Sequence, residues 1–163
     1  MKSVVSLDIV HRQVQALAGW LVLCFAASAT AVFVSTQGWF AQLAKPAWNP
    51  PAWVFGPVWT LLYAMMAVAA WLVWREGGWR ARGRALSLFL LQWVLNALWT
   101  PLFFALHRPG PAFADIVALW VALAITVVCF GRVRRMAGVL LLPYLAWVTF
   151  AAALNFAIWR LNA

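Results

Sequence analysis

The segment AWVFGPVWTLLYAMMAVAAWLVW, residues 52–74, decides the fold class because it is long, apolar and free of charged side chains. A transmembrane α-helix needs about 20 predominantly apolar residues to cross roughly 30 Å of hydrocarbon. The core of a soluble domain seldom requires an uninterrupted run of this length. We therefore interpret residues 52–74 as a membrane-spanning helix.

Four further apolar runs flank this segment, and charged or polar turns separate them. They predict spans at residues 14–34, 85–105, 112–130 and 136–159. The whole chain is 67% hydrophobic with a mean hydropathy of +0.90, which is outside the range of soluble domains. Short connections favour antiparallel packing of consecutive helices. The sequence thus predicts an all-α membrane protein, a bundle of five transmembrane helices forming one domain over residues 1–163.

The first span is the one with a second interpretation, since an apolar run near an N-terminus is also typical of a signal peptide. At about 20 residues the run is longer than the core of a typical signal peptide. We expect a first transmembrane helix here, with a cleaved signal as the alternative.

The net charge of +9 and the pI near 11.4 come from basic residues that lie mostly in the connections. This placement indicates membrane topology and contact with lipid headgroups, and nucleic-acid binding is not expected. One side of the predicted bundle carries Lys2, Arg12, Arg75, Arg80, Arg82, Arg84, Arg132, Arg134 and Arg135, and the other carries Lys45, Arg108 and Arg160. For a bacterial inner membrane the positive-inside rule then places the N-terminus in the cytoplasm.

Residues for conventional catalysis are sparse. Asp8, Glu76 and Asp115 are far apart in the sequence, and His11 and His107 lie near the ends of predicted spans. This distribution forms no carboxylate pair, metal-ligand cluster or catalytic triad. We expect no metal, no required cofactor and no hydrolytic chemistry.

Amides and aromatic residues form two stripes at helical spacing. Gln92, Asn96, Trp99 and Phe103 share one face of the third span, and Tyr144, Trp147, Ala151 and Asn155 share one face of the fifth. Amides inside a membrane need hydrogen-bond partners, so both faces should point into the bundle. Two interpretations remain: contacts that hold the helices together, or a ligand cavity lined by both stripes.

The position of these residues along the helix axis favours one half of the membrane. At 1.5 Å per residue, Trp53, Asp115, Asn155, Trp99 and Asn96 all fall within about 12 Å of the side that holds the long connection 35–51. A cavity capped by that connection is the simplest interpretation. Asp115 has a second interpretation, as a carboxylate in the first turn of its helix, where the helix dipole favours a negative charge.

The start of the second span has its own local signals. Asn49, followed by Pro50 and Pro51, is a candidate N-cap. Pro57 falls inside the predicted span, where we expect it to kink the helix. Such a kink would widen a pocket beneath the long connection.

Three stretches carry a family resemblance: KPAWNPPAWVFGPVWTLLY at residues 45–63, QWVLNALWTPLFF at 92–104 and LPYLAWVTFAAALNFAIWR at 142–160. They resemble the signatures of the tryptophan-rich sensory protein family, which includes translocator protein, and the resemblance extends over residues 38–160. It implies a five-helix bundle, commonly a homodimer, with a pocket beneath the first loop for tetrapyrroles such as protoporphyrin IX and haem.

Carried over by motif, the resemblance assigns ligand contacts to Trp53, Asn96, Trp99, Trp147 and Ala151. Further candidate pocket or gating residues are Lys45, Trp48, Phe55, Trp59, Phe103, Asp115, Tyr144 and Asn155. Animal relatives bind cholesterol through a segment with a tyrosine ahead of a basic residue. Because LNFAIWR, residues 154–160, has Phe156 and Ala157 there, sterol binding is not expected.

Three functions follow from the resemblance. The leading hypothesis is a membrane receptor or carrier that binds porphyrin or haem in tetrapyrrole or stress regulation, in contact with membrane lipid. The alternative is an enzyme that promotes light- and oxygen-dependent porphyrin degradation. A transporter of porphyrin or lipid-like ligands is the third, although no internal repeat of the kind common in transporters is evident.

Overall fold

The computed structural model describes residues 2–32 and 37–163, and in these ranges every regular element is helical. The long helices are α1 (Lys2–Ala26), α4 (Phe55–Trp74), α5 (Gly78–Thr100), α6 (Pro109–Val133) and α7 (Arg135–Leu161). The short elements are α2 (Ala29–Val32), α3 (Trp39–Gln42), the 3₁₀ turn η1 (Ala52–Val54) and the π-helical turn η2 (Pro101–Ala105).

Five stretches of the described chain are long and apolar enough to cross a membrane. They are Val10–Ala31, Ala52–Trp74, Gly78–Ala105, Pro109–Val133 and Arg135–Leu161. Each coincides with one of the five predicted spans. The all-α membrane fold and its five helices are therefore confirmed.

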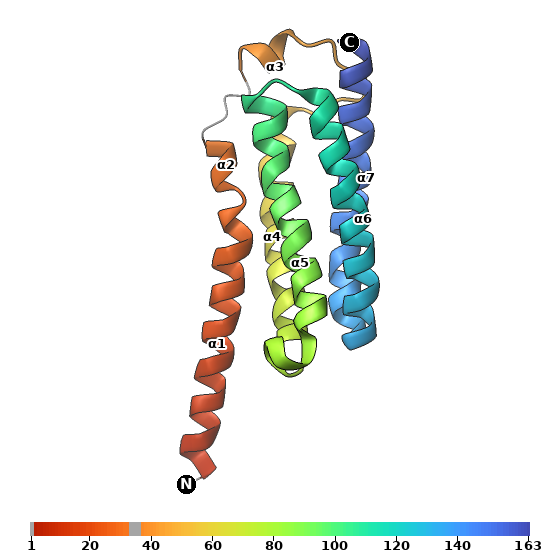
Figure 1. Cartoon of the computed structure of the whole chain (residues 1–163). Helices are drawn as coiled ribbons and strands as arrows, with labels where there is room; N and C mark the ends of the chain where they lie inside the picture. The colour runs from red at the N-terminus through yellow and green to blue at the C-terminus, as the bar shows by residue number, and fades with distance from the viewer. Residues whose placement is uncertain (1, 33–36) are drawn as a thin grey trace.

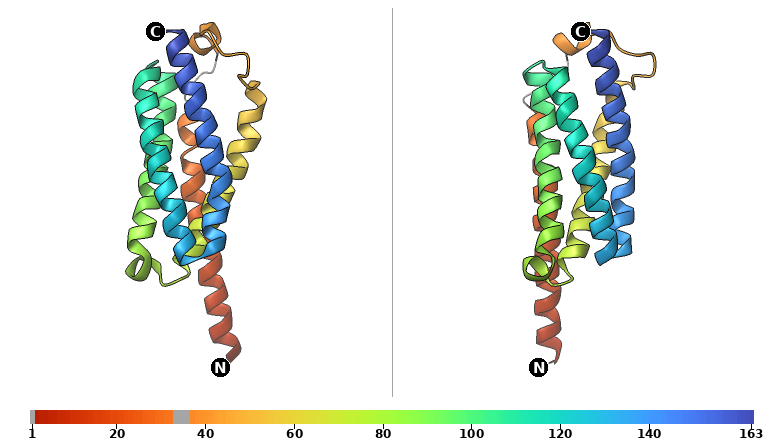
Figure 2. Two further views of the ribbon diagram at one scale, coloured as in Figure 1. Left: turned by 90° about the vertical axis from the view of Figure 1, so that its right-hand side faces the viewer. Right: turned by 45° about the vertical axis from the view of Figure 1, so that its right-hand side comes forward.

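Helices α4 to α7 form the body of the bundle, and α1 packs along α4 (Figure 1). The most extensive packing is between α6 and α7, followed by α5 with α6, α1 with α4, and α4 with α7. Figure 2 shows that the N-terminus and the α4–α5 and α6–α7 turns lie at one end of the bundle, whereas α3 and the C-terminus lie at the other. The predicted grouping of the connections into two sides is confirmed. We call the end that carries the N-terminus and the arginine-rich α4–α5 and α6–α7 turns the basic end, and α1 extends beyond it.

The helices extend past the predicted span boundaries because hydropathy marks where lipid ends and not where a helix ends. Helix α5 begins at Gly78 and not at residue 85, but its backbone is kinked at Arg82 (φ −125°, ψ 16°), so Arg80 lies on the helical turn before the kink and Arg84 on the helix after it. Long basic side chains tolerate this position because their stems pack on apolar surface while their charges reach water.

The first span differs from the prediction at both ends. The helix that carries it, α1, begins at Lys2, and the α-helix breaks after Ala26, before the short α2. Near the break, Ser28 Oγ donates to Phe25 O at 2.6 Å and Thr30 Oγ1 donates to Ala27 O at 2.9 Å. Such bonds from side chain to backbone bend helices. The predicted residues 33 and 34 lie outside the described residues.

The start of the second span corrects two predictions. Asn49 does not cap a helix, because its Nδ2 donates to Pro50 O and α4 begins only at Phe55, after η1. Pro57 therefore lies in the first turn of α4, where an N–H group has no helical partner. It does not kink the interior of the span as expected.

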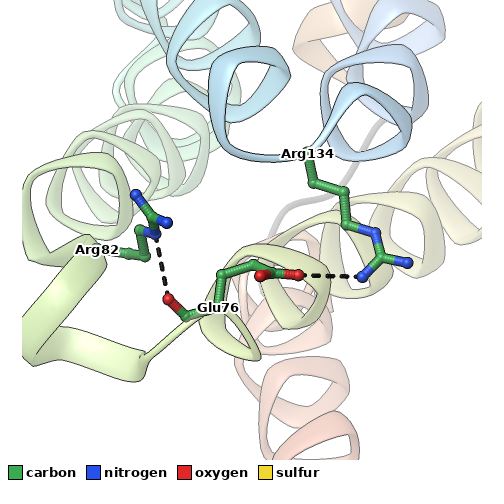
Figure 3. Close-up of polar contacts among 3 residues, drawn as sticks. All are labelled: Glu76, Arg82 and Arg134. Carbon is green, nitrogen blue, oxygen red and sulfur yellow. Dashed lines mark hydrogen bonds and ion pairs between the residues drawn. The ribbon is translucent and has the colours of Figure 1, made fainter.

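A polar tether fixes the two turns at the basic end (Figure 3). The Glu76 carboxylate accepts a hydrogen bond from Arg134 Nη1 at 3.1 Å, and the Glu76 carbonyl accepts one from Arg82 Nε at 3.2 Å. The α4–α5 turn is thereby linked to the α6–α7 turn. Since these side chains are well exposed, the contribution of this ion pair to stability is below about 1 kcal/mol.

Helices α6 and α7 come together at a glycine contact. A Cβ atom added to Gly138 would lie 2.8 Å from Gly131 Cα and 3.0 Å from Val127 O. Only a residue without a side chain permits this approach. This close approach allows α6 and α7 to pack tightly against each other.

Candidate functional site

A cavity of about 480 Å³ lies at the end of the bundle that carries α3 and the C-terminus. Its walls come mainly from α4, α5, α6 and α7. The long connection between the first two spans lies over it, and we call the described part of this connection, residues 37–51, the cover. The lining residues are Ala31, Phe40, Asn49, Pro50, Pro51, Ala52, Phe55, Trp59, Asn96, Trp99, Thr100, Phe104, Ile116, Leu119, Trp147, Val148 and Ala151. Most are apolar or aromatic, as is usual for a small-molecule site.

Trp59 is the centre of the aromatic wall. Its ring stacks on Tyr63 with centroids 5.2 Å apart, and it meets the edges of Tyr144 and Trp147 at 6.1 and 6.5 Å. Phe55, one helical turn before it, meets Trp147 edge to face at 5.8 Å. Aromatic pairs in these geometries stabilise one another beyond their buried area, so the rings of the wall hold one another in position.

Asn96 supplies a polar group to the cavity. It is 5% exposed, and its Oδ1 accepts a hydrogen bond from the Tyr63 hydroxyl at 3.1 Å. This bond links α5 to α4 and fixes the plane of the amide. The amide nitrogen is the group of this side chain that can donate a hydrogen bond.

Asn155 holds Trp99 in place. Its Oδ1 accepts a hydrogen bond from Trp99 Nε1 at 3.0 Å, and its Nδ2 donates to the carbonyl of Pro109 at 2.8 Å. Trp99 also stacks on Phe103 at 5.3 Å. One buried amide on α7 thus positions an indole on α5 and the start of α6, while lying outside the cavity lining itself.

The first connection is fixed to the end of α7. Asn162 Oδ1 accepts from the Ala44 N–H and Asn162 Nδ2 donates to the Ala44 carbonyl, both at 2.9 Å. Nearby, Lys45 Nζ donates to Ala41 O and Leu43 O and lies 4.7 Å from the centroid of the Phe40 ring. These contacts close the segment over the cavity.

A second set of contacts fixes α3. The Trp39 ring stacks on His107 with centroids 4.3 Å apart and meets the edge of Phe103 at 5.8 Å. Phe40, which lines the cavity, packs edge to face on Phe103 and Phe104. The α5–α6 connection is therefore the base on which the cover over the cavity rests.

The structure brings six of the sequence-predicted residues together in the cavity lining: Phe55, Trp59, Asn96, Trp99, Trp147 and Ala151. They come from α4, α5 and α7, as the two stripes and the second span indicated. Whether they contact a ligand stays a prediction.

Trp53, which the sequence assigned to the ligand, lies outside this lining. It is in η1, and its side chain is 75% exposed. Because α4 begins two residues later, the helical phase that directs Phe55 and Trp59 inward does not apply to Trp53. The structure therefore gives Trp53 no place in the cavity wall.

The other predicted pocket or gating residues also lie outside the lining. Tyr144 and Phe103 are buried behind it, and Asn155 anchors Trp99. Trp48 is half-exposed and packs on Phe150 at 5.8 Å. Lys45 belongs to the cover, and Asp115 is half-buried, next to the lining residue Ile116 on α6.

The sequence interpretation predicted that the first connection caps the cavity, but it missed the α6 wall and the residues of the connection that line the cavity. Ile116 and Leu119 lie three positions apart on one face of α6, but nothing in their chemistry distinguishes them from lipid-facing residues. Pro50, Pro51 and Ala52 line the cavity because the connection folds back over it. The lining residue Thr100 was also missed. The α5 stripe could have indicated it, because Thr100 lies four residues after Asn96 and so shares its face of the helix.

Comparison with known proteins gives one consistent result. The model of the TspO/MBR family matches residues 17–160. The chain is 45% identical to tryptophan-rich protein TspO of Archaeoglobus fulgidus over 129 residues, which cover 79% of this chain and 83% of that protein. It is 41% identical to the tryptophan-rich sensory protein of Cereibacter sphaeroides over 143 residues, 88% of this chain and 89% of that protein.

An animal protein is similar to a comparable extent. The chain is 42% identical to human translocator protein over 143 residues, which cover 85% of this chain and 83% of that protein. Together with five membrane-spanning helices, these matches confirm the resemblance found in the three tryptophan-rich stretches. The chain belongs to the TspO/MBR family and is a multi-pass integral membrane protein.

Proposed function

We propose that this protein is a membrane receptor or carrier that binds a tetrapyrrole such as protoporphyrin IX or haem in the cavity beneath the first connection. One observation carries the proposal: three indole rings from three helices, Trp59, Trp99 and Trp147, line a single volume of about 480 Å³. This volume is within the range of small-molecule sites, roughly 300–1,000 Å³.

The chemistry of the walls fits a flat, largely apolar macrocycle. Indole faces and edges pack against an aromatic ring system, and burial of its apolar surface contributes roughly 25 cal/mol per Å². The amide of Asn96 adds one hydrogen-bonding group within the cavity. No acid–base pair is required for such a role.

The carboxylates of a porphyrin need a different environment, since an unpaired charge is costly to bury. The cationic Lys45 lies over Phe40, a lining residue, at the covered end of the cavity. Arg108 is exposed in the α5–α6 connection at the same end of the bundle. We expect the two propionates at this end, where lysine, arginine and water are accessible.

A direct titration tests the proposal. The protein in lipid nanodiscs is titrated with protoporphyrin IX in the dark, and the quenching of tryptophan fluorescence is measured. The proposal expects saturable quenching with one porphyrin bound per chain. Non-saturable quenching that tracks the partition of porphyrin into protein-free nanodiscs would reject it.

We also infer that the basic end of the bundle faces the cytoplasm of a bacterial inner membrane, because it carries the arginine-rich turns. Two exposed positions test this, Ala47 near the cover and Arg80 at the basic end. In intact cells a membrane-impermeant maleimide should label Ala47→Cys and spare Arg80→Cys until the cells are lysed. The reverse pattern would contradict the orientation.

A further inference from the structure

A second chamber adjoins the tryptophan-lined cavity. It has a volume of about 320 Å³ and lies between the C-terminal end of α1, the start of α4 and the end of α5. Both chambers are lined by Ala31, Phe55, Trp59, Asn96, Trp99 and Thr100. The two chambers therefore adjoin at these six residues, and a molecule that reaches past them would extend from the first chamber into the second.

The second chamber differs from the first in the groups that it presents. Four hydroxyl-bearing residues line it, Ser28, Thr60, Tyr63 and Thr100, beside the Asn96 amide. The first chamber is lined mainly by aromatic and aliphatic side chains and shares only Thr100 of these hydroxyls. No lysine, arginine, aspartate or glutamate is among the residues found to line the second chamber.

Three of the four hydroxyl protons on this wall already have an acceptor within the protein, and that of Thr100 has none among the described residues. Ser28 Oγ donates to Phe25 O at 2.6 Å, and Thr60 Oγ1 donates to Gly56 O at 2.9 Å. The Tyr63 hydroxyl donates to Asn96 Oδ1 at 3.1 Å. Each of these oxygens keeps lone pairs that accept hydrogen bonds. The wall thus offers several acceptors to a neutral donor group, beside donors from Thr100 and the Asn96 amide, and it offers no cation to a carboxylate.

The first and second chambers therefore suit different edges of a bound molecule. Lys45 lies against Phe40, which lines the first chamber and not the second. A carboxylate in the second chamber would be left without a cation, at a cost that exceeds the gain from a neutral hydrogen bond. The uncharged edge of the molecule is the one that this chamber accepts.

We propose that the second chamber is a subsite for a neutral hydroxyl group on the edge of the bound molecule that is opposite its carboxylates. This inference rests on the proposed function, since it assigns an orientation to a ligand held by Trp59, Trp99 and Trp147. Ser28 and Thr60 form the exposed rim of the subsite, and Tyr63 forms its buried end. The chamber then acts as a specificity-determining element for ring substituents.

Two porphyrins test this directly. Haematoporphyrin carries 1-hydroxyethyl groups at the two positions where protoporphyrin IX carries vinyl groups, and both have the same two propionates. The measured quantity is the ratio of their Kd values in nanodiscs of one lipid composition. Removing one hydrogen-bond acceptor should weaken haematoporphyrin binding about three- to tenfold. Protoporphyrin IX binding should change by less than about twofold, because vinyl groups donate no hydrogen bond.

The test variants are Ser28→Ala and Thr60→Val, alone and together. Both positions are exposed, and each variant's protoporphyrin titration shows whether its cavity is intact. Thr60→Ser keeps the hydroxyl and should keep the wild-type ratio. Thr149→Val is the matched control, since this hydroxyl accepts from Trp120 Nε1 at 2.8 Å on the outer face of α7.

A Kd ratio that is the same in the double variant and the wild type would overturn the subsite while leaving the tetrapyrrole proposal intact. If protoporphyrin IX itself fails to bind the wild type, both proposals fall. A ratio that changes in Ser28→Ala and Thr60→Val, and not in Thr60→Ser or Thr149→Val, is the result that the subsite requires.

Discussion

Trp59 on α4 and Trp147 on α7 meet edge to face in the wall of the cavity, with ring centroids 6.5 Å apart and planes at 87°. The contact joins the two helices on which the aromatic wall is built. Trp59 is held from its other side by stacking on Tyr63. A site whose rings are positioned in advance loses little side-chain entropy on binding, and this is why we assign binding to these residues.

Asn155 is the residue whose loss should disturb the site most without touching the ligand. Asn155→Leu leaves Trp99 Nε1 and the Pro109 carbonyl without their partner. Unpaired buried polar groups cost about 1–3 kcal/mol each, so the free energy of unfolding should fall by at least that amount. For a chain of this size the thermal midpoint in detergent should drop by about 2–4 °C per kcal/mol.

The control for this prediction is Ala153→Leu, an exposed position on the same helix. Its thermal midpoint should match the wild type. If Asn155→Leu unfolds at the wild-type temperature, the two hydrogen bonds do not hold Trp99.

The Gly131–Gly138 contact predicts an asymmetry between two glycine substitutions. Gly138→Ala places a Cβ atom 2.8 Å from Gly131 Cα, and overpacking of this kind costs about 1–3 kcal/mol. Gly19→Ala meets nothing within 4 Å and should stabilise α1 by up to about 1 kcal/mol, from helix propensity. Thermal unfolding of the two variants should therefore shift in opposite directions, and a stable Gly138→Ala would refute the close approach of α6 and α7.

The Asn162–Ala44 pair predicts a graded series in the cover over the cavity. Asn162→Ala removes both hydrogen bonds to Ala44, whereas Asn162→Asp keeps an acceptor for the Ala44 N–H and loses the donor. Hydrogen exchange of the Ala44 amide should be fastest in the alanine variant and intermediate in the aspartate variant. Porphyrin dissociation, followed by stopped-flow fluorescence, should accelerate roughly threefold or more in Asn162→Ala. Equal exchange rates in all three proteins would show that the pair does not hold the cover.

Light distinguishes a receptor from an enzyme that degrades porphyrin. The proposed role expects bound protoporphyrin IX to bleach under illumination in air no faster than the free pigment in empty nanodiscs. Absorbance spectra and chromatography of the pigment follow this. One defined product formed over many turnovers would instead favour the enzyme hypothesis.

The fold was predictable because lipid imposes a length and a composition on each helix. Uncharged runs such as residues 52–74 located all five spans. The irregular backbone was less predictable. The π-helical turn Pro101–Ala105 and the break after Ala26 depend on where individual carbonyl groups find donors, and hydropathy carries no such information.

The site was predictable where helical phase alone determines which way a side chain points. Asn96 and Trp99 on α5, and Trp147 and Ala151 on α7, line the cavity as their spacing indicated. Trp53 does not, because its direction depends on the 3₁₀ turn before α4. The sequence indicated that the first connection caps the cavity but not how it is held, since Ala44 is hydrogen-bonded to Asn162, a residue 118 positions further along the chain.

The proposal that the cavity wall binds porphyrin is tested most directly by a comparison of two tryptophans six residues apart. Trp53 and Trp59 lie at the start of the same membrane span, and only Trp59 lines the cavity. Protoporphyrin IX is titrated into the wild type, Trp59→Ala and Trp53→Ala in nanodiscs, and the three Kd values are measured by fluorescence quenching. We expect a Kd about tenfold higher or more for Trp59→Ala, which corresponds to a loss of about 1.4 kcal/mol of packing, and a Kd within about twofold of wild type for Trp53→Ala. Equal Kd values in Trp59→Ala and the wild type, or a larger effect of Trp53→Ala, would contradict it.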